Sequence, residues 1–238
     1  MSLATQSLLV TRAEVPAGLV AIPVRTPLVR PGDDLIAIVA RAVRGIARAG
    51  DVVAISESAV AIAQGELIAA EFVRPGRVAF ALARRAGPLA TMSQPESVQL
   101  VIDRVGMGKV LYATLLHVIS RARGRRGVFY EVLGEAVAAF DGYTGTMPPY
   151  ERAIVFTPRD PDGFARSFQE RTGIACAVVD ANDLRKAKVL GASGEIDRDS
   201  VEAALLDNPH GNSDEQTPVV VLKWRGAGTN PLRVGGGS

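Results

Sequence analysis

The sequence predicts an α+β or irregular mixed α/β fold. Short apolar runs typical of buried strands recur along the chain, and segments with a helical spacing of apolar residues lie among them. Clean strand–helix alternation is missing from the middle, which separates this chain from a regular α/β protein. Apolar residues make up 47% of the 238 positions and charged residues 22%, so the chain can bury a core. Because aromatic residues make up only 5%, small aliphatic side chains must fill most of that core.

The first half of the chain is expected to contain both strands and helices. Residues 19–24 are expected to form an edge strand, because Pro23 has no N–H to donate to a neighbouring strand. Asp33 or Asp34 is suited to cap the following helix, which ends near Gly50. The remaining predictions here are a strand at 51–55, helices at 59–64, 75–85 and 95–106, and two ambiguous segments at 66–70 and 109–120.

The second half contains most of the predicted strands. Their ranges are 128–132, 135–140, 153–157, 174–180 and 218–224, with helices at 163–172 and 197–206. The clearest unit runs strand–helix–strand, since a turn at 158–162 caps its helix and Gly173 stops it. Residues 1–225 are expected to form a single unit, with two intertwined subdomains as an alternative. The glycine-rich tail 226–238 is expected to be flexible and to lie outside the fold.

Composition excludes several classes of protein and site. Cys176 is the single cysteine and there are two histidines, so neither an internal disulfide nor a zinc-ligand set can be assembled. Within its apolar run, Cys176 is expected to be a small buried hydrophobe rather than a nucleophile. A dispersed net charge of +2 argues against nucleic-acid binding. The single cysteine makes a reducing, cytoplasmic setting the expectation. No 18-residue uncharged apolar stretch and no secretory signal is evident, so neither a transmembrane helix nor a membrane partner is expected.

Two predicted strands lead into a carboxylate. The run 136–140 precedes Asp141, and the run 174–179 precedes Asp180, with Asp183 three residues later. Carboxylates at the rim of a sheet are common in ligand sites, and oxygen ligands without Cys or His suit Mg²⁺ or Mn²⁺. The alternative is that each Asp begins a turn, and spacing alone favours the turns.

Familiar nucleotide-binding and catalytic motifs are missing from the sequence. It has no Walker A loop, Rossmann glycine fingerprint, nucleophile elbow or kinase motif set. A nucleotide would therefore be held by an unorthodox loop. The candidates are the segment 23–26 with Ser56, and the polar loop 207–218, where Gly211 lets backbone amides approach a phosphate. The alternative, which the residues alone favour, is an ordinary surface loop.

The order of several segments along the chain is informative. They are 22–26, 31–35, 50–55, 63–65, 158–162, the strand into Asp180, and 211–221. Taken together, they resemble the gamma-glutamyl ligases that extend the deazaflavin coenzyme F-420, over roughly residues 19–222. The resemblance implies a GTP-dependent amide-forming enzyme with Mg²⁺ or Mn²⁺, a mixed α/β fold and an intertwined homodimer. The implied substrates are a small-molecule carboxylate and L-glutamate.

The resemblance also implies roles for particular residues. Metal binding falls on Asp141, Asp180 and Asn212. Asp183 is a further candidate, because the hydroxyl residue that usually follows the second Asp is here Ala181. The implied nucleotide-binding residues are Ile22, Pro23, Val24, Arg25, Ser56, Gly211, Asn212, Ser213, Asp214 and Glu215. No side chain is assigned a catalytic role.

Departures from the family pattern leave alternatives open. The family usually carries Lys and Glu at the positions of Ile62 and Gln64, and a basic residue at the position of Glu66. Thr144 lies in a stretch that differs from the usual Asn-Ala-Gly-Ile-Asp-x-Ser-Asn. These changes fall on expected metal, nucleotide and substrate positions. The alternatives are a non-catalytic nucleotide- or ligand-binding protein on the same scaffold, and a metal-dependent phosphohydrolase.

Overall fold

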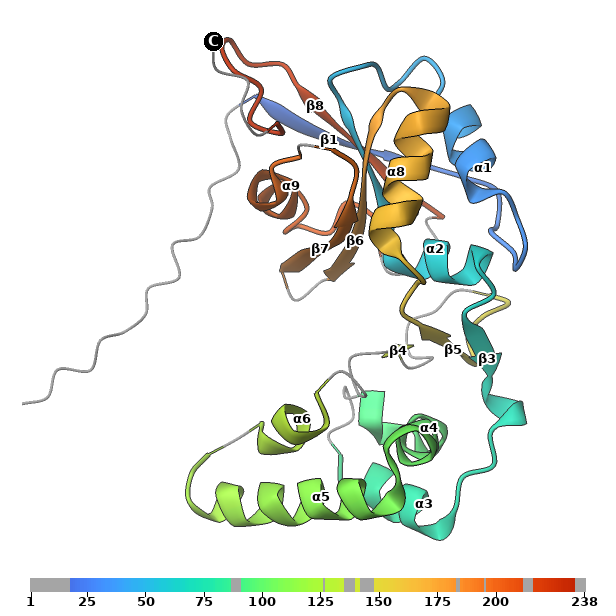
Figure 1. The fold of residues 1–238 in the computed structure, drawn as a ribbon, viewed down its shortest axis with the longest axis vertical. Helices are drawn as coiled ribbons and strands as arrows, with labels where there is room; N and C mark the ends of the chain where they lie inside the picture. Colours follow the sequence, from blue (N-terminus) through green and yellow to red (C-terminus); the bar gives the residue numbers. More distant parts are fainter. Residues whose placement is uncertain are drawn as a thin grey trace, which may run out of the picture.

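The computed structural model describes residues 18–86, 91–125, 127–134, 140–141, 148–182, 185–194, 196–211 and 216–233. Figure 1 shows two lobes, one built on a β-sheet and the other helical. The sheet of the first lobe has five strands. A small three-stranded sheet lies between the two lobes. The prediction of a mixed α and β fold is confirmed.

The five-stranded sheet has the order β1-β8-β2-β6-β7. Its strands are β1 (Leu19–Val24), β2 (Val52–Ser56), β6 (Ala175–Asn182), β7 (Lys186–Ala192) and β8 (Val219–Trp224). β2 and β6 run parallel, and the other neighbours are antiparallel. β1 is an edge strand, as Pro23 predicts, because a residue without an N–H is tolerated there. The last of these strands in sequence, β8, is inserted between β1 and β2.

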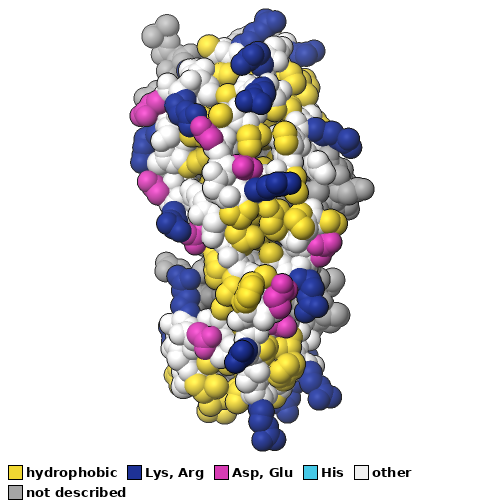
Figure 2. Space-filling view, turned by 90° about the vertical axis from the view of Figure 1, so that its right-hand side faces the viewer, with side chains coloured by type: hydrophobic (Ala, Val, Ile, Leu, Met, Phe, Trp, Pro, Cys, Tyr) yellow, Lys and Arg dark blue, Asp and Glu magenta, His cyan; other side chains and the backbone are white. Residues whose placement is uncertain are grey.

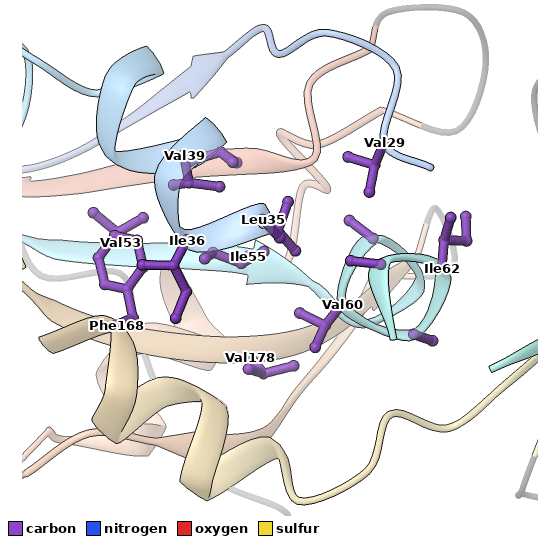
Figure 3. Close-up of a cluster of buried hydrophobic side chains, with 14 of the residues drawn as sticks. Val29, Leu35, Ile36, Val39, Val53, Ile55, Val60, Ile62, Phe168 and Val178 are labelled. Carbon is purple, nitrogen blue, oxygen red and sulfur yellow. The ribbon is translucent and has the colours of Figure 1, made fainter. Parts of the chain in front are cut away.

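Apolar side chains alternate between two cores on the two faces of this sheet. Val53 and Ile55 point into a first core, which is covered by α1 (Leu35–Ala42), α2 (Glu57–Ala63) and α8 (Pro161–Thr172). Val52 and Ala54 point into a second core beneath α9 (Arg198–Ala204). Figure 3 shows the first core, where Phe168 of α8 lies beside Val53. This period of two follows from the pleat and fixes the register of the strands.

Asp side chains begin three of the helices around this sheet. Asp34, Asp160 and Asp197 each accept a hydrogen bond from a backbone N–H in the first turn. Of the two candidates for the first cap, Asp33 and Asp34, the structure uses Asp34. α8 ends at Gly173, which adopts φ 72°. The predicted strand–helix–strand unit from 153 to 180 is therefore confirmed in its elements.

The small sheet joins the two lobes. It contains β3 (Leu67–Ala69), β5 (Ala153–Phe156) and β4 (Phe140–Asp141) in that spatial order. Ala153 and Val155 of β5 pack into the first core, whereas Ile154 points into the core of the helical lobe. One short strand thus serves both lobes, because alternate side chains of a strand face opposite ways.

The helical lobe consists of α3 (Arg77–Ala83), α4 (Pro95–Val105), α5 (Met107–Ala122) and α6 (Val128–Leu133), with 3₁₀ turns at Ala70–Phe72 and Thr91–Ser93. Gly106 separates α4 from α5 at φ 85°, a left-handed conformation that suits glycine. The ambiguous segment 109–120 lies within α5. None of the helices among the described residues is long and apolar enough to cross a bilayer.

One predicted strand is a helix in the structure, and another can be checked only at its last residue, Phe140, which lies in β4. Residues 128–132 lie in the helix α6. Their β-branched and aromatic residues favour strands, but the segment packs on α5, where Phe129 meets His117 edge-on with ring centroids 6.5 Å apart. Of the predicted strand 135–140, residues 135–139 lie outside the described residues. The sequence also failed to indicate β7, because two lysines and a glycine weaken its apolar pattern.

Residues 226–233 belong to the fold, contrary to the expectation for the glycine-rich tail. Leu232 is fully buried in the second core. The side chain of Asn230 donates to the carbonyl of Gly50 at 2.9 Å, and the N–H of Asp197 donates to the carbonyl of Leu232 at 3.0 Å. Burial of this one leucine side chain holds the segment on the sheet, although the glycine-rich sequence around it favours flexibility. Residues 234–238 lie outside the described residues.

Candidate functional site

One edge of the five-stranded sheet gathers most of the segments that the sequence singled out. Val219 of β8 pairs with the last residue of β1 on one side and with Ile55 of β2 on the other. Because β8 runs opposite to both, the ends of β1 and β2 meet the segment that precedes β8. β6 runs parallel to β2 with Val179 opposite Ser56, so Asp180 reaches the same edge.

Backbone hydrogen bonds tie these segments together. The N–H of Thr26 donates to the carbonyl of Gln216 at 3.1 Å, and the N–H of Ser56 donates to the carbonyl of Pro218 at 2.8 Å. Both bonds lie just beyond the paired strands. The candidate segment 23–26, Ser56 and the end of the polar loop are therefore neighbours, although they come from three separate parts of the sequence.

The predicted nucleotide residues on β1 differ in what they present to solvent. The side chains of Ile22 and Val24 belong to the first core, whereas Pro23 and Arg25 are exposed. Ser56 ends β2 and precedes α2, and its side chain makes no capping hydrogen bond to that helix. Among these predicted nucleotide-binding residues, Arg25 carries a positive charge, and its exposed guanidinium is suited to an anionic ligand.

The polar loop before β8 is closed at its base by His210 and Thr217. Nδ1 of the imidazole lies 3.2 Å from the carbonyl oxygen of Thr217, and the Thr217 hydroxyl donates to the carbonyl of His210. Gly211 adopts φ 73°, but its N–H already donates to the carbonyl of Asn208 at 3.0 Å. That amide is therefore not free to approach a phosphate. The other predicted residues of this loop lie outside the described residues: Asn212, Ser213, Asp214 and Glu215.

The sequence reasoning did not single out His210. Its ring is buried, and its Nε2 has no hydrogen-bond partner in the described part of the chain. Burial lowers the pKa of His210 to about 4, and the contact with the Thr217 carbonyl opposes the shift. The imidazole is therefore neutral near pH 7, with its proton on Nδ1, because a carbonyl only accepts. The feature of the sequence that could have pointed to His210 is its position in a polar loop just before an apolar strand.

Asp180 lies inside β6 rather than at its end, which corrects the expectation from the sequence. The strand continues to Asn182, because β7 pairs with it and places Lys188 opposite Asp180. The carboxyl group keeps contact with solvent, yet desolvation by the surrounding protein raises its pKa, and the charge of Lys188 opposes that shift. Asp180 is thus a partly desolvated carboxylate with a cationic neighbour.

The predicted metal ligands are described only in part. Asp141 lies in β4 of the small sheet, opposite Val155. α2 contacts both β5 and β6, so it links the two sheets that carry Asp141 and Asp180. Asp183 and Asn212 lie outside the described residues. Among the residues that are described, no group of three or more His, Cys, Asp and Glu side chains is placed to hold a metal.

Arg159, between β5 and α8, engages two of the positions that depart from the family pattern. The Gln64 side chain accepts from the N–H of Arg159 at 2.7 Å and donates to its carbonyl at 3.1 Å. Glu66 forms an ion pair with the guanidinium of Arg159. The third position, Ile62, is buried in the first core. These three side chains thus have structural partners within the protein.

The single cysteine lies in the first core, as expected. Cys176 is fully buried in β6, and burial raises the pKa of its thiol far above the usual range. A protonated, inaccessible thiol is a poor nucleophile, so the chemistry of this protein must rest on other groups.

Comparison with known proteins bears on the segments at the sheet edge. A family model described as F420-0:Gamma-glutamyl ligase matches residues 23–194, which is most of the chain. The chain belongs to this ligase family. A relative from Methanopyrus kandleri, named coenzyme F420:L-glutamate ligase, is 27% identical over 227 residues, covering 82% of this chain and 82% of that protein. The resemblance inferred from the sequence is confirmed. The matched span includes Ser56, Asp141 and Asp180 but ends before the polar loop closed by His210.

Proposed function

We propose that this member of the ligase family is a GTP-dependent enzyme that joins L-glutamate to a small-molecule carboxylate by an amide bond. The observation that carries the proposal is the meeting of β1, β2, β6 and the loop before β8 at one sheet edge. These are the segments that the resemblance links to nucleotide and metal. Sheet edges where several loops converge are common ligand sites in proteins of this type. The name of the relative from Methanopyrus kandleri supports glutamate as a substrate.

The proposed reaction has two steps. A carboxylate oxygen of the acceptor attacks the γ-phosphorus of GTP, the bond to the bridging oxygen breaks, and GDP leaves. The amine of glutamate then attacks the acyl carbon of the acyl phosphate, forming the amide, and phosphate and one proton leave. Because the first step brings a carboxylate to a triphosphate, the site must neutralise several negative charges.

We assign Mg²⁺ or Mn²⁺ to Asp141, Asp180 and Asn212, with Asp183 as a further candidate ligand. Their carboxylate and amide oxygens are the donors that these hard cations prefer. When bound, the metal supplies charge neutralisation at the phosphates. The nucleotide is assigned to 22–25, Ser56 and 211–215, with the exposed guanidinium of Arg25 facing the phosphate charge.

Glutamate incorporation, followed by mass spectrometry, tests this proposal. The wild-type protein with GTP, Mn²⁺, L-glutamate and either F420-0 or a panel of small carboxylates should yield a glutamylated product and one GDP per product. Asp180→Asn should lower turnover by about 100-fold or more, because it removes a metal-binding charge. Asp199→Asn on the exposed side of α9 is the matched control and should keep full turnover. Wild-type turnover in a folded Asp180→Asn protein would reject this role for Asp180.

A non-catalytic nucleotide- or ligand-binding protein on the same scaffold is the second candidate. Three positions favour it, because this chain lacks the charged residues that the family usually carries there. Gln64 and Glu66 bond to Arg159, and Ile62 is buried. This candidate predicts GTP binding without product for every acceptor. Any glutamylated product rejects it, and phosphate release without an acceptor would indicate a phosphohydrolase.

We also propose that the ligase acts as a homodimer in the cytoplasm. Large apolar side chains left exposed on the helical lobe support association of two copies. The single cysteine, which forms no disulfide, supports a reducing compartment.

A further inference from the structure

His210 is a buried polar residue at the sheet edge to which the proposed function assigns no role. It is 8% exposed, and its Nε2 has no hydrogen-bond partner in the described part of the chain. Burying a polar nitrogen without a partner costs folding free energy, so an apolar side chain of similar size would suit folding equally well. A histidine at this place therefore calls for an explanation other than stability.

The backbone that carries His210 is fixed on the sheet lobe. Leu205, which follows α9, is fully buried in the second core. The N–H of Asn208 donates to the carbonyl of Leu205 at 2.9 Å, and the N–H of Gly211 donates to the carbonyl of Asn208 at 3.0 Å. These turns hold the chain on both sides of His210. The imidazole is therefore attached to a fixed point of the fold.

His210 and Thr217 are joined by two reciprocal hydrogen bonds, and we call this pair the clamp. Nδ1 of the imidazole donates to the Thr217 carbonyl at 3.2 Å, and the Thr217 hydroxyl donates to the His210 carbonyl. Two bonds between the same residues fix their relative orientation as well as their distance. Because His210 is anchored, the clamp holds Thr217 in place.

Thr217 lies between the two residues that bond to the ends of β1 and β2. The carbonyl of Gln216 accepts from the N–H of Thr26 at 3.1 Å. The carbonyl of Pro218 accepts from the N–H of Ser56 at 2.8 Å. The clamp is therefore connected, through the two neighbours of one residue, to both strand ends that carry predicted nucleotide residues.

Arg25 depends on this junction for its position. It is exposed, but Val24 and Thr26 on either side of it are each only 6% exposed. Packing of Val24 in the first core fixes the backbone before Arg25, and the bond from Thr26 to Gln216 fixes the backbone after it. The point from which the guanidinium extends is thus set partly by the clamp.

Position is decisive here, because surface charge alone does not define an anion site. Figure 2 shows Lys and Arg side chains interspersed with Asp and Glu side chains on the side of the sheet lobe that carries α1. A triphosphate must therefore be recognised by groups that are held at suitable places. Groups that are already held bind more tightly, since less conformational entropy is lost on binding.

We propose that His210 is a positioning residue for the nucleotide, acting through Thr217 to hold Arg25 and Ser56 in place. This inference rests on the proposed nucleotide site at the sheet edge, but it does not require the ligase reaction. The role requires an N–H donor at the place of Nδ1. Loss of such a donor should weaken GTP binding and leave the chemical step unchanged.

Calorimetric titration of GTP with Mn²⁺ into variants of the full chain tests this role. His210→Leu fills similar space without a donor and should weaken binding about 5- to 10-fold, the size expected for one lost hydrogen bond. His210→Asn can place an amide N–H where Nδ1 was and should bind within about 2-fold of the wild type. Thr217→Val tests the clamp from its other side, also if His210→Leu fails to fold, and should weaken binding about 3- to 10-fold.

Thr114→Val in α5 is the matched control for Thr217→Val. The half-buried hydroxyl of Thr114 also donates to a backbone carbonyl, that of Val110 at 2.8 Å, but it lies in the helical lobe. This variant should bind GTP as the wild type does. A loss of affinity equal to that of Thr217→Val would overturn the role of the clamp.

Two further readouts separate positioning from stability. With product formation as the assay, His210→Leu should raise KM for GTP about 5- to 10-fold and leave kcat and KM for L-glutamate unchanged. Hydrogen exchange at the N–H groups of Thr26 and Ser56 should become faster in the same variant. The midpoint of thermal unfolding at pH 7 should stay within about 4 °C of the wild type, because removal of the unpaired nitrogen offsets the lost bond.

The outcomes distinguish this inference from the proposed function. If the wild type binds GTP and His210→Leu binds it equally well, the positioning role is overturned and the nucleotide site stands. If His210→Leu and His210→Asn lose the same affinity, the donor at Nδ1 is not responsible and the role is again overturned. A wild type that binds no GTP with any metal overturns the nucleotide site and this role together. GTP binding without product rejects the ligase reaction alone, since the affinities of the variants still decide the role of His210.

Discussion

The sheet lobe and the helical lobe bury their apolar residues to different extents. In the sheet lobe, β2 and β8 are covered on both faces, and none of the large exposed apolar side chains in the described ranges belongs to it. In the helical lobe, α5 buries Val110 and Ala113 but leaves six larger apolar side chains in contact with water. The difference teaches that the sheet lobe buries its large apolar side chains within one chain, whereas α5 of the helical lobe leaves one side of its apolar surface open to solvent.

The largest expected effect is a difference between the lobes in how much unfolding free energy is lost when a phenylalanine is replaced by alanine. Phe168→Ala should lower the free energy of unfolding by about 3–5 kcal/mol, because it leaves a cavity between α8 and the sheet. Phe80→Ala in the helical lobe, where the side chain is 49% exposed, should change it by less than about 1 kcal/mol. Urea denaturation followed by circular dichroism measures both. Equal losses in the two variants would remove the distinction between the lobes.

The C-terminal anchor of the sheet lobe should also be sensitive. Leu232→Ala should cost about 2–5 kcal/mol, since Leu232 is fully buried in the second core. Leu232→Met, which conserves volume, should cost less than about 1.5 kcal/mol. Thermal unfolding of both variants gives the comparison. A negligible loss in the alanine variant would mean that 226–233 does not pack on the sheet in solution.

The sheet edge should lose stability in acid through His210. The pKa of this residue is lowered by burial to about 4, so the unfolded chain binds a proton at a higher pH than the folded chain does. Its contribution is therefore complete above about pH 6.5 and is lost as the pH falls toward 4, amounting to about 3 kcal/mol. His210→Gln should flatten the dependence of unfolding free energy on pH between 4 and 6.5. An unchanged slope would show that the imidazole is not buried as a neutral group.

The smallest of these effects concerns the cap of α8. Asp160 accepts from the N–H of Gly163 at 2.9 Å, so Asp160→Ala should cost about 1 kcal/mol. Asp160→Asn should cost less, because asparagine can keep the cap and tolerates the left-handed conformation at φ 42°. Chemical denaturation of the two variants tests this. If both lose the same stability, the carboxylate charge rather than the cap is responsible.

The elements of the sheet lobe could largely be predicted from the sequence, but their order could not. The strands near 51–55 and 218–224 are apolar runs between turn residues, and such local patterns are visible in one sequence. The insertion of β8 between β1 and β2 depends on pairing between distant segments, which no local pattern records. In the helical lobe the prediction of a strand at 128–132 was wrong. The residues there favour a strand, but packing on α5 stabilises a helix.

In the candidate site, too, some residues could be located from the sequence and others could not. Ser56 and the segment 23–26 were located because they follow recognisable strands, and the structure brings them together with the loop before β8. Arg159 was not foreseen, because its bonds to Gln64 join residues 95 positions apart in the chain. His210 was missed because its burial and its contact with Thr217 arise only when the loop closes. The roles predicted for Asp141 and Asp180 in metal binding remain predictions.

Calorimetric titration of GTP tests most directly whether this sheet edge is a nucleotide site. The protein would be titrated with GTP and with ATP, each in the presence of Mn²⁺, of Mg²⁺ and of a chelator. We expect GTP to bind with a dissociation constant in the micromolar range, only when the divalent metal is present, and ATP to bind more weakly. No GTP binding under any of these conditions would contradict it.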